Sequence, residues 1–283
     1  MIDEGKILSR HEVRKENSML IIFSIIFILA FSLVIIILAV TTPLFSTPSI
    51  LSILCVAIAA IALSSLLYLR LYSNPIFTYF LYEKGIRVFP PHNGKVYFIP
   101  FNKIQYIHKY HLGINSDGKI NAMAFRTSKL QPWNIITNNI KNAYPLINTL
   151  IHKQVINVGV ISLDSLSKGE PILFEVIKKN DNWLEKLMFH GVINIIKDNI
   201  IAIETSPISL SAHCLATSES IINMEDILYI ETQRETHHDK IQLFDAKGKI
   251  LFTIDYSALV SADLFIALVE HMIQNRIPAY HDS

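Results

Sequence analysis

The sequence predicts an α+β protein in which an N-terminal transmembrane helical hairpin precedes two tandem modules, each a small β-barrel closed by a helix. Three observations predict this class. No charged residue lies between Met19 and Leu69. After Pro75 the pattern changes to short segments rich in Ile, Val, Phe and Tyr, separated by turn residues. Finally, one such segment recurs about 120 residues further along the chain.

The uncharged segment is long enough for two membrane spans. A span needs about 20 apolar residues to cross roughly 30 Å of hydrocarbon. Met19–Val40 and Ser49–Tyr72 each meet that length, and the turn-like Thr41–Pro48 separates them. We therefore expect residues 1–18 to form an N-terminal tail and residues 19–72 to form the hairpin.

The charges that flank this segment predict its orientation. Lys and Arg occur on both sides of it, at Lys6, Arg10, Arg14 and Lys15 before it and from Arg70 onward after it. Because such residues favour the cytoplasmic side, both termini are predicted to be cytoplasmic. The predicted location is the bacterial inner membrane, with a multi-pass chain and the lipid bilayer as one partner.

The remaining chain is predicted to hold two domains and a linker. The first, residues 75–155, contains alternating strands and then a helix from Asn134 to about Lys153, which Pro145 is expected to kink or divide in two. Residues 156–190 are predicted to be an inter-domain helical linker. The second domain, residues 191–277, is expected to end in a helix over about Ser261–Asn275, with Ser261 as its N-cap.

The two domains share a short sequence match. Phe101–Ile107 aligns with Met224–Ile230, and in each case a β-rich segment precedes it and another strand follows. A fixed offset of this kind indicates two copies of one module. Chance similarity of so short a stretch is the alternative.

A β-meander that ends in one amphipathic helix resembles a bacterial pleckstrin-homology (PH)-like domain. The segments Leu81–Val88 and Ile99–Ile104 are similar to the membrane-anchored YcxB-like group, in which a two-span hairpin precedes one such domain. The resemblance implies a PH-like fold for both modules. It carries no catalytic or binding residues to this chain, and the second copy departs from the single-domain layout.

Composition and motifs argue against an enzyme. The net charge of +1 gives no basic field for nucleic acid, and two cysteines, Cys55 and Cys214, suggest no disulfide framework. No phosphate-binding, zinc-protease or serine-hydrolase motif is present. His108 and His111 would point to opposite faces of a strand, and so would His213 and Cys214. We therefore predict no catalytic residue, no cofactor and no metal site.

Two sets of residues are candidates for contacts. The basic Arg70, Lys84, Arg87 and Lys95 lie near the predicted membrane and are candidates to face anionic lipid. Trp133 and Trp183 are candidate protein-contact residues, with packing in the core as the alternative.

The sequence thus predicts a non-enzymatic inner-membrane protein whose cytoplasmic PH-like domains bind a protein partner or another copy, in an interaction, regulatory or immunity-type role. The alternative is a sensor of anionic lipid headgroups at the cytoplasmic face. An enzyme with a pocket around His108, His111 or Cys214 is a third alternative.

Overall fold

The computed structural model describes residues 3–12, 77–90, 95–110, 122–138, 140–177, 205–234 and 239–275, together with positions 23, 25–34, 37, 52, 56, 58–60 and 62–63. Contacts divide the chain into two units. The larger unit comprises Met1–Glu12 and Ile76–Ser283, and the smaller unit is Val13–Pro75.

The first half of the larger unit is built from two antiparallel sheets. One has the order β1-β2-β3-β4 and the other the order β5-β6-β7. Their bounds are β1 Ile7–His11, β2 Thr78–Tyr82, β3 Gly85–Phe89, β4 Tyr97–Pro100, β5 Tyr106–Tyr110, β6 Ala122–Arg126 and β7 Asn134–Thr137. A 3-10 turn, η2 (Phe101–Lys103), links the two sheets, and helix α3 (Ala143–Ser167) follows β7.

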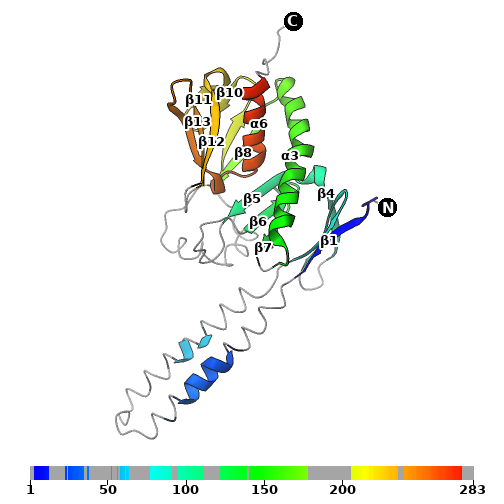
Figure 1. Cartoon of the computed structure of the whole chain (residues 1–283), viewed down its shortest axis with the longest axis vertical. Helices are drawn as coiled ribbons and strands as arrows, with labels where there is room; N and C mark the ends of the chain where they lie inside the picture. Colours follow the sequence, from blue (N-terminus) through cyan, green and yellow to red (C-terminus); the bar gives the residue numbers. More distant parts are fainter. Residues whose placement is uncertain are drawn as a thin grey trace. The chain divides into compact units, whose positions relative to one another are not determined.

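The second half repeats this arrangement (Figure 1). Its sheets have the orders β11-β10-β9-β8 and β12-β13-β14. The bounds are β8 Ile172–Ile177, β9 Thr205–Leu210, β10 Cys214–Ala216, β11 Ile221–Asn223, η3 Met224–Asp226, β12 Tyr229–Arg234, β13 Asp239–Phe244, β14 Ile250–Asp255, η4 Tyr256–Ala258 and α6 Ala262–Asn275. We call β1–β7 with α3 the first module, and β8–β14 with η4 and α6 the second module.

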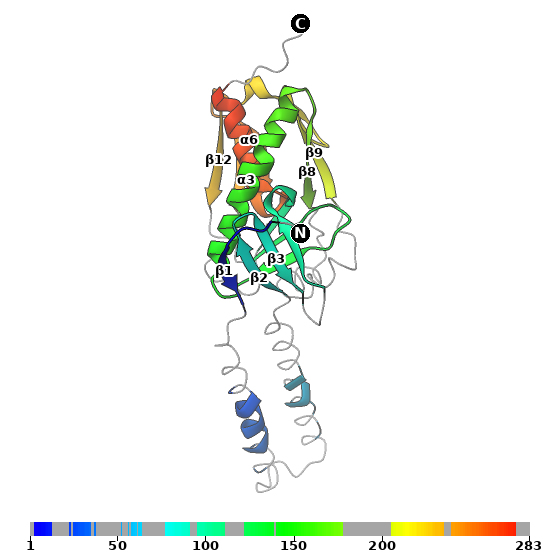
Figure 2. The same ribbon diagram turned by 90° about the vertical axis from the view of Figure 1, so that its right-hand side faces the viewer.

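Helix α3 belongs to both hydrophobic cores. Its N-terminal half buries Leu146, Ile147 and Leu150 among the strands of the first module. Its C-terminal half places Leu166 in the core of the second module, where α6 also packs. Figure 2 shows α3 running beside α6 and continuing past the sheets of the first module.

The fold class predicted from the sequence is wrong. The described residues form four antiparallel sheets with helices, and no hairpin of two membrane spans is seen among them. Within the predicted first span the described helix is Ile25–Val34, which is shorter than a span requires. Most of the predicted second span, Ser49–Tyr72, lies outside the described residues.

The structure also assigns a different role to the N-terminal segment. Ile7–His11, predicted to lie in a tail, forms β1 and pairs with β2 in register, His11 opposite Tyr79. The imidazole of His11 is buried, and its Nδ1 lies 3.1 Å from the carbonyl oxygen of Lys141. The chain therefore leaves the first sheet after β1 and rejoins it in the neighbouring strand.

Three further predictions about elements are wrong. Asn134–Thr137, predicted as the start of a helix, is strand β7. Ile172–Ile177, predicted within a helical linker, is strand β8. Pro145 does not kink or divide α3, because it lies in the first turn of the helix. A backbone N–H there would have no acceptor within the helix, so proline removes no helical hydrogen bond.

By length and composition, α3 is the one described helix able to cross a membrane. The same criterion is met by core helices, and the buried residues of α3 lie in both cores. A multi-pass membrane location therefore has no support from the part of the chain that the structure describes.

Candidate functional site

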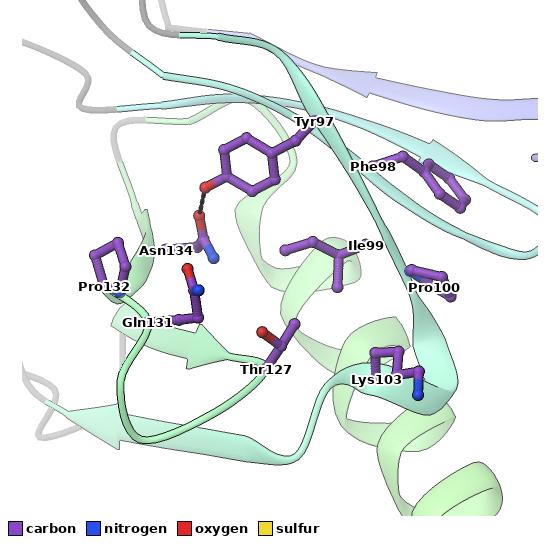
Figure 3. A pocket seen from close by; sticks show the side chains of 9 residues that line it. All are labelled: Tyr97, Phe98, Ile99, Pro100, Lys103, Thr127, Gln131, Pro132 and Asn134. Carbon is purple, nitrogen blue, oxygen red and sulfur yellow. Dashed lines mark hydrogen bonds between the residues drawn. The ribbon is translucent and has the colours of Figure 1, made fainter. Parts of the chain in front are cut away.

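A cavity of about 330 Å³ opens beside the edge strand of the first sheet (Figure 3). We call it the β4 pocket. It is lined by Tyr97, Phe98, Ile99 and Pro100 of β4, by Lys103 of η2, by Thr127, Gln131 and Pro132 of the β6–β7 loop, and by Asn134 of β7.

Two edges of the β-structure border the β4 pocket. β4 is the last strand of its sheet, and β7 is the last strand of the other. The hydroxyl of Tyr97 donates a hydrogen bond to Oδ1 of Asn134 across the space between them. Burial raises the pKa of the Tyr97 hydroxyl above its ordinary value of 10.0, at which the group is already a donor at neutral pH.

The surroundings of the β4 pocket are apolar and basic. Leu130, in the loop that lines the pocket, is 95% exposed, and Val96 next to β4 is also exposed. Lys103 is the charged residue among those that line the pocket, and Lys95 is exposed just before β4. An open strand edge is a surface to which an extended protein segment can add.

The loop that lines the β4 pocket is fixed by charged groups. Arg126 and Lys129 both contact the buried carboxylate of Glu175 on β8, at 3.1 and 2.6 Å. The hydrogen bond to Glu175 raises the pKa of the Lys129 ammonium. The guanidinium of Arg126 also lies 4.2 Å from the centre of the Trp133 ring. The position of this loop therefore depends on the second module.

Ser261 connects the modules at a second point. Its backbone N–H donates to the carbonyl oxygen of Ile107 at 2.6 Å, and the N–H of Ile107 donates to its Oγ at 3.2 Å. Gln154 on α3 donates to the same Oγ at 3.0 Å. The side chain of Ser261 thus reaches the first module, although the sequence predicted it as the N-cap of the following helix.

The structure places the predicted lipid-facing residues in different environments. Lys84 forms an ion pair with Asp3, and Arg87 lies 2.6 Å from Glu4, so both charges have partners in the N-terminal segment. Lys95 is exposed near the β4 pocket. Arg70 lies outside the described residues.

The two predicted protein-contact tryptophans, Trp133 and Trp183, have different outcomes. Trp133 is buried, and it packs with Ala122 and Ile135 against Val260 of the second module. Its indole therefore contributes to the contact between modules. Trp183 lies outside the described residues.

The histidines do not converge in the described part of the chain, where no group of three or more His, Cys, Asp or Glu side chains could hold a metal ion. His108 stacks on Tyr110 with ring centres 5.4 Å apart, and burial lowers its pKa to about 4. His213 is exposed beside half-buried Cys214, whose thiol lies 3.4 Å from the hydroxyl of Ser211. His111, His190, His237 and His238 lie outside the described residues.

Sequence reasoning missed the residues that make up the β4 pocket. Tyr97, Lys103, Gln131 and Asn134 come from four different parts of the chain, and only the sheet order shows that β4 and β7 are edges. The available signal was weak: a turn-rich stretch, Thr127–Pro132, that carries a leucine between polar residues.

Compared with known proteins, the chain matches no family model and no curated protein.

Proposed function

We propose that this chain is a non-enzymatic binding protein that holds an extended segment of a protein partner in the β4 pocket. The observation that carries the proposal is the open edge of β4 beside a cavity, with an exposed leucine in the loop that lines this cavity. An extended peptide added to such an edge gains main-chain hydrogen bonds, while the adjoining cavity accepts alternate side chains.

The chemistry of the pocket favours a particular type of segment. Lys103 offers an ammonium group to a carboxylate, and Tyr97 and Asn134 offer polar atoms opposite it. Leu130 and Val96 offer apolar surface at the side of the cavity. The preferred ligand is therefore an extended segment that combines aliphatic and acidic side chains.

We further propose that the protein acts at the bacterial inner membrane. The described helix Ile25–Val34 carries exposed apolar side chains, among them Phe27, Leu29 and Phe31, within a segment that has no charged residue. Contact with lipid hydrocarbon removes such apolar side chains from water, which is favourable.

The resemblance to the YcxB-like group is part of this proposal. It is supported by the antiparallel meander followed by a helix in each module. The lipid-sensing alternative is not carried further, because Lys84 and Arg87, two of its four candidate residues, are already paired with carboxylates.

Site-specific photo-crosslinking in cells tests the binding function. A photoreactive residue in place of Leu130 is expected to form one discrete protein adduct, and the change Lys103→Glu in the same chain is expected to weaken it severalfold. The matched control replaces Lys168, an exposed residue at the end of α3, and should form no adduct. Equal adducts from both positions, or none from position 130, would contradict the proposal.

A further inference from the structure

The second module has a counterpart of the β4 edge. In both modules the fourth strand lies at the edge of its sheet and leads directly into a 3-10 turn, η2 after β4 and η3 after β11. The correspondence extends to backbone detail. Asn142 and Ser261, each directly before a module's helix, are the described non-glycine residues with positive φ, at 56° and 58°.

This correspondence reverses the charge at one position. Lys103 is the last residue of η2, and Asp226 is the last residue of η3. Both side chains are exposed at the end of an edge strand. A surface that presents an ammonium group in the first module therefore presents a carboxylate in the second.

The β11 edge is acidic and apolar. Glu219, Glu225 and Asp226 are exposed on either side of β11, and Asn223 donates a hydrogen bond to Asp226 that holds its carboxylate. Ile221 of β11 is 74% exposed.

We propose that the partner in the β4 pocket is a second copy of this chain, which adds its β11 edge to the β4 edge. This inference rests on the proposed binding function and names its partner. In the resulting contact the two edge strands run parallel, so the carboxylate of Asp226 from one copy lies opposite Lys103 of the other. Ile221 covers the apolar surface beside Leu130 and Val96. The two four-stranded sheets become one continuous sheet across the contact.

Charge decides between this contact and the symmetric alternatives. Pairing β4 with β4 brings the lysines of two copies together, and pairing β11 with β11 brings the acidic groups together. Like charges placed opposite each other across an interface disfavour the contact. The contact is therefore between different surfaces of the two copies, and such contacts continue from copy to copy unless they close into a ring.

Two charge reversals in the full-length protein, purified in mild detergent, test the inference by sedimentation. The wild type is expected to form assemblies larger than two copies. Lys103→Glu and Asp226→Lys are each expected to weaken self-association by about tenfold or more, since each brings like charges together. Glu270→Lys, at an exposed position on α6, is the matched control and should assemble as the wild type does.

Mixing the two variants is the decisive step. One copy then supplies an intact β11 edge and the other an intact β4 pocket, so an equimolar mixture is expected to form a complex although each variant alone does not. A higher salt concentration should weaken this complex, because salt screens the attraction between the two charged edges. Variants that assemble like the wild type, or a mixture that stays dissociated, would overturn the inference.

The adduct at position 130 separates this inference from the proposed function. An adduct that contains only a different protein leaves the binding function standing and refutes the second copy as partner. The absence of any adduct refutes both. An adduct of two copies of this chain, lost with Asp226→Lys, is the expected result.

Discussion

At the scale of single residues, His108 shows how burial gives a histidine an unusually low pKa. Its ring is close to those of Tyr110 and Trp133, with ring centres 5.4 and 6.4 Å away. Its Nδ1 is shielded from solvent and has no hydrogen-bond partner among the described residues. Burial disfavours the charged imidazolium, which is why the pKa falls to about 4.

This shift predicts how stability depends on pH. Between the ordinary pKa of 6.5 and about 4, the unfolded chain binds a proton at His108 that the folded chain does not, so the free energy of unfolding falls as the pH is lowered through this range. The loss reaches about 3 kcal/mol at the acidic end. Thermal melts of His108→Phe should lose this component relative to the wild type, whereas His271→Phe, at an exposed histidine, should keep it. Parallel pH profiles for the wild type and His108→Phe would contradict the assignment.

At the scale of elements, the two glycines Gly159 and Gly85 predict opposite outcomes for the same change. Gly159 lies inside α3, and a Cβ there would come no closer than 3.6 Å to Leu264, so Gly159→Ala should stabilise the protein by about 1 kcal/mol. A Cβ at Gly85 would collide with the carbonyl oxygen of Ile99 and the backbone of Pro100 in the neighbouring strand. Gly85→Ala should therefore destabilise the first sheet. Thermal unfolding of both variants checks the pair, and a destabilised Gly159→Ala would show that α3 and α6 pack more tightly here than the structure indicates.

Elements whose signal is local were predictable from the sequence, and elements defined by distant partners were not. The helix Ala262–Asn275 lies within about a residue of its predicted bounds, because helical spacing is a property of the segment itself. Strand β1 was missed because its partner β2 follows more than 60 residues later. The β4 pocket was missed for the same reason, since edges exist only once the sheet order is known.

At the scale of the whole molecule, the pairing of β1 with β2 makes the segment Val13–Pro75 an insertion into an otherwise continuous hairpin. His11 and Tyr79 are direct partners, so the chain on either side of the insertion lies one strand spacing apart. Both modules are stabilised by contacts that lie outside the insertion: α3 in the two cores, Glu175 with Arg126 and Lys129, and Ser261 with Ile107. The fold of the modules therefore does not require the inserted segment.

Replacing Val13–Pro75 by a short Asn-Gly turn is accordingly expected to give a folded, water-soluble protein. Such a turn suits the twist of two antiparallel strands, and closing a short loop costs less entropy than closing one of more than 60 residues, so the free energy of unfolding should not fall. Circular dichroism and thermal melts of the shortened chain measure its stability, with Gly85→Ala in the same background as the destabilised control.

The full-length chain should remain in the membrane pellet after alkaline extraction, and the shortened chain should be released. A shortened chain that fails to fold would contradict the pairing of β1 with β2, whereas one that folds but still sediments with membranes would show that the modules themselves bind lipid.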